Sequence, residues 1–187
     1  MDSYLDIRLR PSPAAAPAHL TATLFAKLHI VLTIRRCCDI GVSFPEFAEI
    51  PPGLGRCLRL HGTGEALDRL MTPPWLSGMD DYLSVAAIRA TPVTSQYRNV
   101  SRVQAKSNPE RSRRRQMRRH GLSREEAQRR IPDHALTLLN LPYVSLRSRS
   151  TGQQFRLFIR HGPLQTEPVS GVFNAYGLSA TATIPWF

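Results

Sequence analysis

The sequence predicts an α+β protein, with a ferredoxin-like βαββαβ domain followed by a smaller domain that holds an arginine-rich helix and a β-hairpin. Short segments of two-residue alternation, segments of helical spacing between them, and a late arginine block lead to this prediction. Hydrophobic periodicity lapses in the polar stretch 91–97, just before the arginine block. We therefore expect domains at residues 1–95 and 96–187.

The first three elements follow from periodicity. Residues 4–10 alternate apolar and polar side chains, which is the period of a half-buried strand. After a turn rich in proline and alanine, residues 18–36 carry apolar side chains at helical spacing, so an amphipathic helix should pack on that strand. Residues 40–44 alternate again and indicate a second strand.

The rest of the first domain completes the pattern. Leu58 and Leu60 mark a third strand, Thr63 is a suitable N-cap for a helix that reaches Met71, and residues 82–90 fit a fourth strand. In a βαββαβ domain two helices cover one face of a four-stranded antiparallel sheet. The other face is then free for a ligand or a second domain.

The second domain should begin with two short helices. Asn108 followed by a proline is a strong helix start, so we predict a helix over residues 109–120 that Gly121 ends. Ser123 and Glu126 have the spacing of a capping box, which predicts a second helix that ends near residue 131. Further on we expect, in order, a hairpin of residues 143–148 and 155–160, a loop through 162–163, and short strands near 172–176 and 180–185.

Arginine dominates the charge of this chain. The net charge is +11, and 23 of the 25 basic residues are arginines. Residues 1–97 hold nine basic and nine acidic side chains, whereas residues 98–130 hold twelve basic and three acidic ones. The guanidinium fork matches phosphate and guanine edges and stacks on bases. We predict a nucleic-acid ligand for the second half; a solvated basic surface or a disordered basic tail is the alternative.

The predicted helix over 109–120 carries its arginines in a stripe. Arg111, Arg115, Arg118 and Arg119 lie at helical spacing along about two turns, with Arg114 beside them. Such a stripe would follow a phosphate backbone, and its affinity should fall as salt rises. Arginine-rich helices also occur in ribosomal and DNA-binding proteins, so the stripe by itself does not specify RNA.

Arg102 and Gln104 lie two residues apart in an extended segment before this helix, so their side chains should point to the same side. Arginine pairs bidentately with guanine and glutamine with adenine. The two residues are therefore candidates for reading bases; ordinary solvated linker residues are the other interpretation.

The sequence has no motif for a metal site, a disulfide framework or a membrane span. The six histidines are isolated, and the basic block has no acidic cluster nearby, so we expect no metal and no cofactor. Cys37, Cys38 and Cys57 form no C-x-x-C pair, and an odd number makes a poor disulfide framework. No apolar run approaches the ~18 residues that span a bilayer. We expect a soluble, cytoplasmic protein without a membrane partner.

A nuclease without a metal would have to activate the 2′-hydroxyl of its RNA substrate, and histidine is the usual base near neutral pH. Composition does not indicate which of the six histidines would act as this base. His29 lies beside the apolar stripe of the first helix, one turn from Phe25 and Leu32, where a partly buried structural histidine is the simpler interpretation. Ser148 and Tyr176 would likewise pass as a strand-end serine and a core aromatic residue.

Segments spread over the whole chain carry a resemblance to a known family: residues 4–11, 40–45, 100–111, 150–153, 155–165, 176–179 and 185–187. In these the sequence resembles the repeat-processing endoribonucleases of type I-F CRISPR systems, the Csy branch of the CRISPR-associated RNA-processing nucleases. Runs of this length are far more specific than a short motif.

The resemblance implies roles for individual residues. His29, Ser148 and Tyr176 would form the cleavage site, Arg102 and Gln104 would read bases at the foot of an RNA stem, Phe155 would stack on its terminal pair, and Arg115, Arg118 and Arg119 would hold phosphates. The full set of expected RNA-binding residues is Arg102, Gln104, Lys106, Ser107, Arg111, Arg114, Arg115, Arg118, Arg119, Ser150, Thr151 and Phe155. The A-form major groove is normally too narrow for a helix, so the stem must be short enough for the groove to open near its end.

The implied activity is metal-independent cleavage of CRISPR precursor RNA at the 3′ foot of the repeat hairpin. Attack by the 2′-hydroxyl would leave a 2′,3′-cyclic phosphate and a 5′-hydroxyl. The enzyme would then stay on the hairpin with the other subunits of a type I-F surveillance complex. A non-catalytic RNA-hairpin-binding protein, such as a ribosomal or assembly factor, is the alternative, and a DNA-binding regulator is a third reading.

Overall fold

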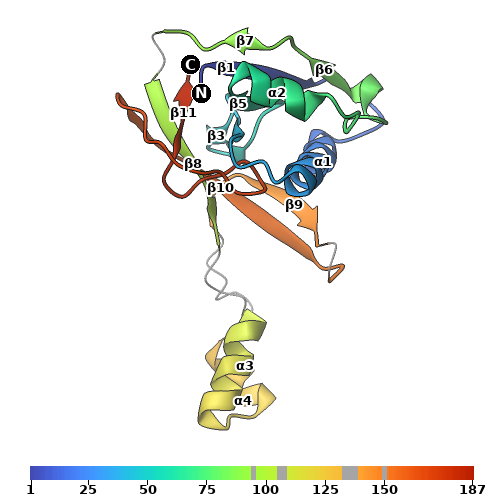
Figure 1. Ribbon diagram of the computed structural model, residues 1–187. Coiled ribbons are helices and arrows are strands. Elements are labelled where there is room, and N and C mark those ends of the chain that lie inside the picture. The colour runs from blue at the N-terminus through green and yellow to red at the C-terminus, as the bar shows by residue number, and fades with distance from the viewer. Residues whose placement is uncertain (94–95, 105–108, 132–138, 149–150) are drawn as a thin grey trace. The chain divides into compact units, whose positions relative to one another are not determined.

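The computed structural model describes residues 1–93, 96–104, 109–131, 139–148 and 151–187. Contacts divide the chain into two compact units: unit 1 comprises Met1–Val103 and Leu141–Phe187, and unit 2 comprises Gln104–Asn140. The fold is mixed α+β, as the sequence predicts (Figure 1). The expected division into domains 1–95 and 96–187 stays a prediction.

The first sheet of unit 1 has the strand order β2-β5-β1-β6, with every neighbouring pair antiparallel. Its strands are β1 (Ser3–Leu9), β2 (Gly41–Ser43), β5 (Cys57–Gly62) and β6 (Leu83–Val85), and β7 (Arg89–Ala90) also pairs with β1. Leu5, Ile7 and Leu9 are buried, which confirms the alternation that predicts β1.

The prediction of one continuous fourth strand over 82–90 is wrong. A 3₁₀ turn, Asp80–Tyr82, occupies its start, and the strand is split into β6 and β7. Val85 pairs with Ile7 and Arg89 with Tyr4, so the register shifts by one residue between the two strands. An extra residue on one strand is a β-bulge, and alternation alone does not reveal it.

Both helices of this unit match their predictions. Helix α1 (Pro17–Arg35) begins with a proline and ends at Arg36, which has a left-handed backbone conformation. Helix α2 (Gly64–Met71) is capped by Thr63, whose Oγ1 accepts a hydrogen bond from the Ala66 N–H at 3.1 Å. By length and composition alone α1 could cross a bilayer. Its leucines nevertheless pack into the core of unit 1.

The second sheet of unit 1 has the order β11-β8-β10-β9. Its strands are β8 (Gln96–Val103), β9 (Tyr143–Arg147), β10 (Gln154–Gln165) and β11 (Thr183–Trp186). The pairing of β9 with β10 confirms the predicted hairpin. The loop expected through 162–163 is wrong, because β10 continues across it with a register shift between His161 and Leu164. A bulge accommodates a proline, which has no N–H to give to the ladder.

The C-terminal segment departs most from prediction. Residues 172–176 form no strand. Backbone N–H groups of this segment donate to the side chain of Asn174 instead of to a neighbouring strand. The strand expected over 180–185 begins later, at Thr183. A small hairpin of β3 (Ala48–Glu49) and β4 (Pro52–Gly53) was not predicted.

One apolar core joins the two sheets of unit 1. It includes side chains of β1, α1 and α2 together with Leu157 and Ile159 of β10 and Ile184 of β11. Helix α1 also packs against β9, as Figure 1 shows. This packing brings the half-buried Ala26, His29 and Ile30 of α1 next to the hairpin.

Unit 2 consists of α3 (Pro109–His120) and α4 (Arg124–Arg130). Gly121 has a positive φ of 63° at the end of α3, and Ser123 and Glu126 form both bonds of the predicted capping box. Ala127 is buried, and Arg113 Nε donates to the Ile131 carbonyl oxygen at 2.7 Å. The predicted N-cap at Asn108 lies outside the described residues.

Candidate functional site

His29 lies on the face of α1 that is turned toward the C-terminal loop. Its Nδ1 is 2.7 Å from the carbonyl oxygen of Ala175. Because a carbonyl oxygen only accepts, Nδ1 must carry the proton, and in the neutral imidazole the lone pair is on Nε2. The side chain is half-buried. This geometry fixes the ring and leaves one nitrogen able to accept a proton.

Tyr176 stacks on His29. The ring centroids are 4.0 Å apart, and the planes are inclined by 10°. The Tyr176 ring is also nearly parallel to that of Phe25, a core residue of α1, with centroids 6.1 Å apart. The guanidinium of Arg102, at the end of β8, lies 5.8 Å from the centre of the Tyr176 ring. Tyr176 therefore connects the imidazole to a residue expected to bind RNA.

Ser148 follows β9 and begins the turn of the hairpin. Its backbone exchanges bonds within the turn, from Ser148 N to the Gln153 oxygen at 2.9 Å and from Gly152 N to the Ser148 oxygen at 2.8 Å. Its Oγ accepts from the N–H of Thr151 at 3.3 Å. Arg147 Nε donates to the Gly152 carbonyl at 2.9 Å and braces the same turn. The hydroxyl is thus held at a defined point.

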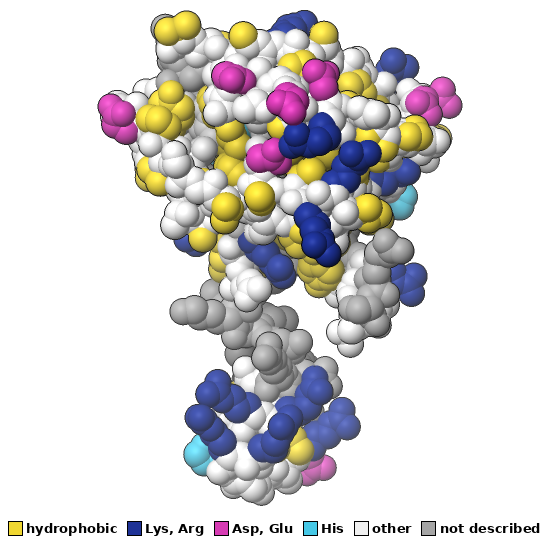
Figure 2. All heavy atoms as spheres, in the orientation of Figure 1, with side chains coloured by type: hydrophobic (Ala, Val, Ile, Leu, Met, Phe, Trp, Pro, Cys, Tyr) yellow, Lys and Arg dark blue, Asp and Glu magenta, His cyan; other side chains and the backbone are white. Residues whose placement is uncertain are grey.

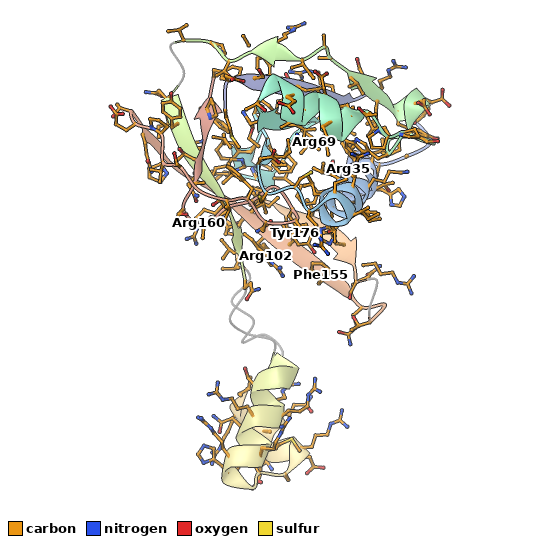
Figure 3. The ribbon with its side chains drawn as sticks, in the orientation of Figure 1. Arg35, Arg69, Arg102, Phe155, Arg160 and Tyr176 are labelled. Atoms are coloured by element: carbon orange, nitrogen blue, oxygen red, sulfur yellow. The ribbon has the colours of Figure 1, made fainter. Side chains whose placement is uncertain are left out.

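These residues share a cavity of about 380 Å³ in unit 1. The lining consists of Ala26, His29, Ile30, Leu146, Arg147, Ser148, Phe155 and Tyr176. Phe155 comes from β10 and is half-buried against the core. Figure 3 shows Phe155, Tyr176 and Arg102 near one another at one end of this unit. The fold therefore brings together all three predicted catalytic residues and one predicted RNA contact, whose roles stay predictions.

The backbone that holds His29 has no signal of its own in the sequence. The Ala175 carbonyl carries no side-chain signature, and Gly177 was not assigned a role. Gly177 has a φ of 69°, and a Cβ built on it would lie 2.3 Å from Cγ2 of Val42. The spacing of Asn174 and Gly177 is a turn signal that could have found this loop.

The arginines of unit 2 form a separate candidate nucleic-acid interface. Arg114, Arg115, Arg118 and Arg119 are exposed and line a hollow of about 580 Å³. Figure 2 shows the dark blue side chains gathered over this unit. Arg113 is instead directed to the end of α4, where it joins the two helices. The stripe is thus presented by a helix that a second, capped helix supports.

The remaining predicted contacts are less defined. Gln104 is exposed at the start of unit 2, and Thr151 is exposed in the hairpin turn. Arg111 belongs to α3, but its side chain is not described. Lys106, Ser107 and Ser150 lie outside the described residues.

Two other histidines are shielded from solvent: His61 is fully buried, and His161 is half-buried with both ring nitrogens covered. His61 donates to or accepts from Ser43 Oγ through Nε2 at 2.8 Å, and burial lowers its pKa to about 3. Burial, with Arg98 nearby, lowers the pKa of His161 to about 4. Within the described part of the chain, no group of three or more His, Cys, Asp or Glu side chains is placed to hold a metal ion.

Comparison with known proteins adds to this geometry. Residues 4–187 match the family described as CRISPR-associated protein (Cas_Csy4). The chain is 54% identical to the "CRISPR-associated endonuclease Cas6/Csy4" of Pseudomonas aeruginosa (strain UCBPP-PA14) and 48% identical to the protein of the same name from Escherichia coli (strain UTI89 / UPEC). Each match covers the full length of both chains.

Proposed function

Because the chain belongs to the Cas_Csy4 family of CRISPR-associated proteins, we propose that it is an endoribonuclease that cuts CRISPR precursor RNA at the 3′ foot of the repeat hairpin. The observation that carries the chemistry is the pairing of His29 Nδ1 with the Ala175 carbonyl. That bond leaves Nε2 to act as the base, beside Ser148 and Tyr176 in one cavity.

The proposed reaction needs no metal ion. Nε2 of His29 takes the proton of the ribose 2′-hydroxyl, the 2′-oxygen forms a bond to phosphorus, and the bond from phosphorus to the 5′-oxygen breaks. The leaving oxygen takes a proton from water and becomes a 5′-hydroxyl, the imidazolium returns its proton to solvent, and the other product ends in a 2′,3′-cyclic phosphate. The Ala175 carbonyl and the stacked Tyr176 ring hold the imidazole in place during this transfer.

Ser148 is proposed to orient the ribose rather than to attack phosphorus. An RNA that is cut by its own 2′-oxygen needs no covalent intermediate with the protein. The bond from the Thr151 N–H holds the Ser148 hydroxyl at the rim of the cavity. Tyr176 is proposed to position the imidazole through its stacked ring.

The hairpin is proposed to bind along the arginine stripe. Arg115, Arg118 and Arg119 are exposed and suited to phosphates, and Phe155 presents a ring to the terminal base pair. Arg102 and Gln104 would read bases at the foot of the stem. The proposed contacts also include Lys106, Ser107, Arg111, Arg114, Ser150 and Thr151.

Three further proposals concern the setting. We assign the first sheet to a ferredoxin-like domain, a view that its order β2-β5-β1-β6 and antiparallel pairing support. We place the protein in the cytoplasm, which its free Cys37, Cys38 and Cys57 support. It would remain on its product with the other subunits of a type I-F surveillance complex, because many arginine–phosphate contacts favour slow release.

The test is cleavage of repeat RNA in EDTA by the wild type and by His29→Ala. The variant should cut about 10² to 10⁴ times more slowly, with hairpin affinity little changed, because the arginine stripe is intact. His19→Ala, which removes an exposed histidine of the same helix, is the matched control and should cut normally. Circular dichroism establishes that each variant is folded.

Three outcomes would overturn the proposal. A requirement for Mg²⁺ would exclude the metal-independent route, and full-rate cutting of RNA with one 2′-deoxy sugar at the cut would exclude attack by the 2′-oxygen. Binding without any cleavage by the wild type would favour the non-catalytic hairpin-binding protein.

A further inference from the structure

The C-terminal loop of residues 174–178 is closed by its own hydrogen bonds. Asn174 Oδ1 accepts from the backbone N–H of Tyr176 at 2.8 Å and from that of Leu178 at 3.3 Å. The backbone adds two bonds, from Asn174 N to the Leu178 oxygen at 2.9 Å and from Gly177 N to the Asn174 oxygen at 2.8 Å. The Asn174 side chain is therefore the internal acceptor around which this loop is built.

The loop is also fixed to the first sheet. The N–H of Val42, on β2, donates to the Gly177 carbonyl at 2.8 Å, and the N–H of Phe173 donates to the Cys38 carbonyl at 3.0 Å. Phe173 and Leu178, which flank the turn, are buried in the core. The ends of the loop are anchored, so the conformation between them depends on the local bonds.

Two consecutive residues of this loop contact His29. The Ala175 carbonyl accepts from Nδ1 at 2.7 Å, and the Tyr176 ring stacks on the imidazole with centroids 4.0 Å apart. The Tyr176 N–H that Asn174 holds belongs to the peptide unit of the same Ala175 carbonyl. Because that peptide is planar, fixing its N–H also fixes the direction of its oxygen.

We propose that Asn174 is a positioning residue for the imidazole of His29. Its amide oxygen orients the Ala175–Tyr176 peptide, and through it the carbonyl that keeps the proton of His29 on Nδ1. The role in cleavage rests on the proposed function, but the control of the tautomer does not. Asn174 lies outside the lining of the cavity, and its amide oxygen is occupied by two backbone N–H groups of the loop, so it acts through the loop.

The conservative variant separates this role from simple loss of a side chain. A carboxylate oxygen accepts the same two N–H bonds as the amide oxygen, so Asn174→Asp keeps the turn, whereas Asn174→Ala removes its acceptor. Asn174→Gln keeps the amide but displaces it by one methylene. Ser179→Ala is the matched control, because Ser179 Oγ accepts from the N–H groups of Thr181 and Ala182 in the next turn, away from His29.

The first measurement is the tautomer of His29, read from the ring ¹⁵N shifts of the free, full-length protein. In the wild type, Asn174→Asp and Ser179→Ala, His29 should be in the Nδ1–H tautomer. In Asn174→Ala and Asn174→Gln, it should be a mixture of the Nδ1–H and Nε2–H tautomers. An unchanged tautomer in both Asn174→Ala and Asn174→Gln would overturn the proposal, whether or not the chain cuts RNA. If Asn174→Ala fails to fold, Asn174→Gln decides the question.

The second measurement is single-turnover cleavage of repeat RNA with saturating protein. Asn174→Ala should lower the cleavage rate about 100-fold, the loss typical of a misplaced catalytic group, while the Kd for the hairpin stays within about twofold. Asn174→Asp should restore the rate. Normal cutting by Asn174→Ala with an altered tautomer would refute the catalytic consequence of positioning. Normal cutting by His29→Ala would instead refute the proposed function and leave the tautomer result standing.

Discussion

His161 should make the stability of the protein depend on pH. Its ring stacks on Phe47 with centroids 3.9 Å apart and lies edge-on to Trp186 at 5.6 Å. Both ring nitrogens are buried, and neither has a hydrogen-bond partner among the described residues. The guanidinium of Arg98 faces the same two aromatic rings. Burial first, and then this cation, lower the pKa of His161 from 6.5 to about 4.

The sign follows from proton binding. Between pH 6.5 and pH 4 the unfolded chain binds a proton at this residue and the folded chain does not, so the free energy of unfolding falls as pH falls through that window. At pH 5 the loss is about 2 kcal/mol relative to pH 8, and below pH 4 it approaches about 3 kcal/mol. His161→Phe fills a similar volume and removes the titration, so lowering the pH should destabilise this variant less than the wild type.

Urea unfolding, followed by tryptophan fluorescence at pH 8 and pH 5, measures the effect. The free energy of unfolding of His161→Phe, minus that of the wild type, should rise by about 2 kcal/mol from pH 8 to pH 5. His19→Phe, at an exposed site of α1, is the control and should show no such rise. An equal pH dependence in His161→Phe and the wild type would refute the reasoning.

Two more predictions concern the arginines. Arg118→Ala should weaken hairpin binding and reduce the slope of log Kd against log salt concentration by about 1. Arg35→Ala, which removes an exposed arginine of α1, should leave that slope unchanged. Binding titrations at several salt concentrations measure both slopes, and a wild-type slope in Arg118→Ala would contradict a phosphate contact. Asp6→Asn should destabilise the protein by about 3 kcal/mol, because it removes the negative charge that pairs with Arg59. The Arg59 side chain is only 10% exposed and bonds both Asp6 oxygens, at 2.7 and 3.0 Å. Urea unfolding measures this loss, and a change under about 1 kcal/mol would show that the pair is well solvated.

Local signals predicted the elements whose partners are close in sequence. Thr63 caps α2, and Ser123 and Glu126 form their capping box, since each bond joins groups three residues apart. The alternation in β1 holds because its apolar side chains face one continuous core. Such features depend on chain geometry that the sequence states directly.

Features set by distant partners were not predictable in this way. The bulge between β6 and β7 arises from pairing with β1, and the continuation of β10 past Gly162 and Pro163 depends on β8. A single chain gives apolar periods but not the register between strands. The bond from His29 to the Ala175 carbonyl joins residues 146 positions apart, so no spacing rule could have found it.

The histidines show that surroundings decide which imidazole is fit to be a base. His61 is fully buried with Nε2 on Ser43 Oγ, and both nitrogens of His161 are enclosed by aromatic rings, so neither is open to a ribose hydroxyl. Burial also opposes the charge that either would gain on taking a proton. His29 differs because it opens on a cavity and already donates from Nδ1 to a carbonyl, which leaves the lone pair on Nε2. The partly buried histidine that apolar spacing indicates is therefore also the one whose partners suit it to take a proton.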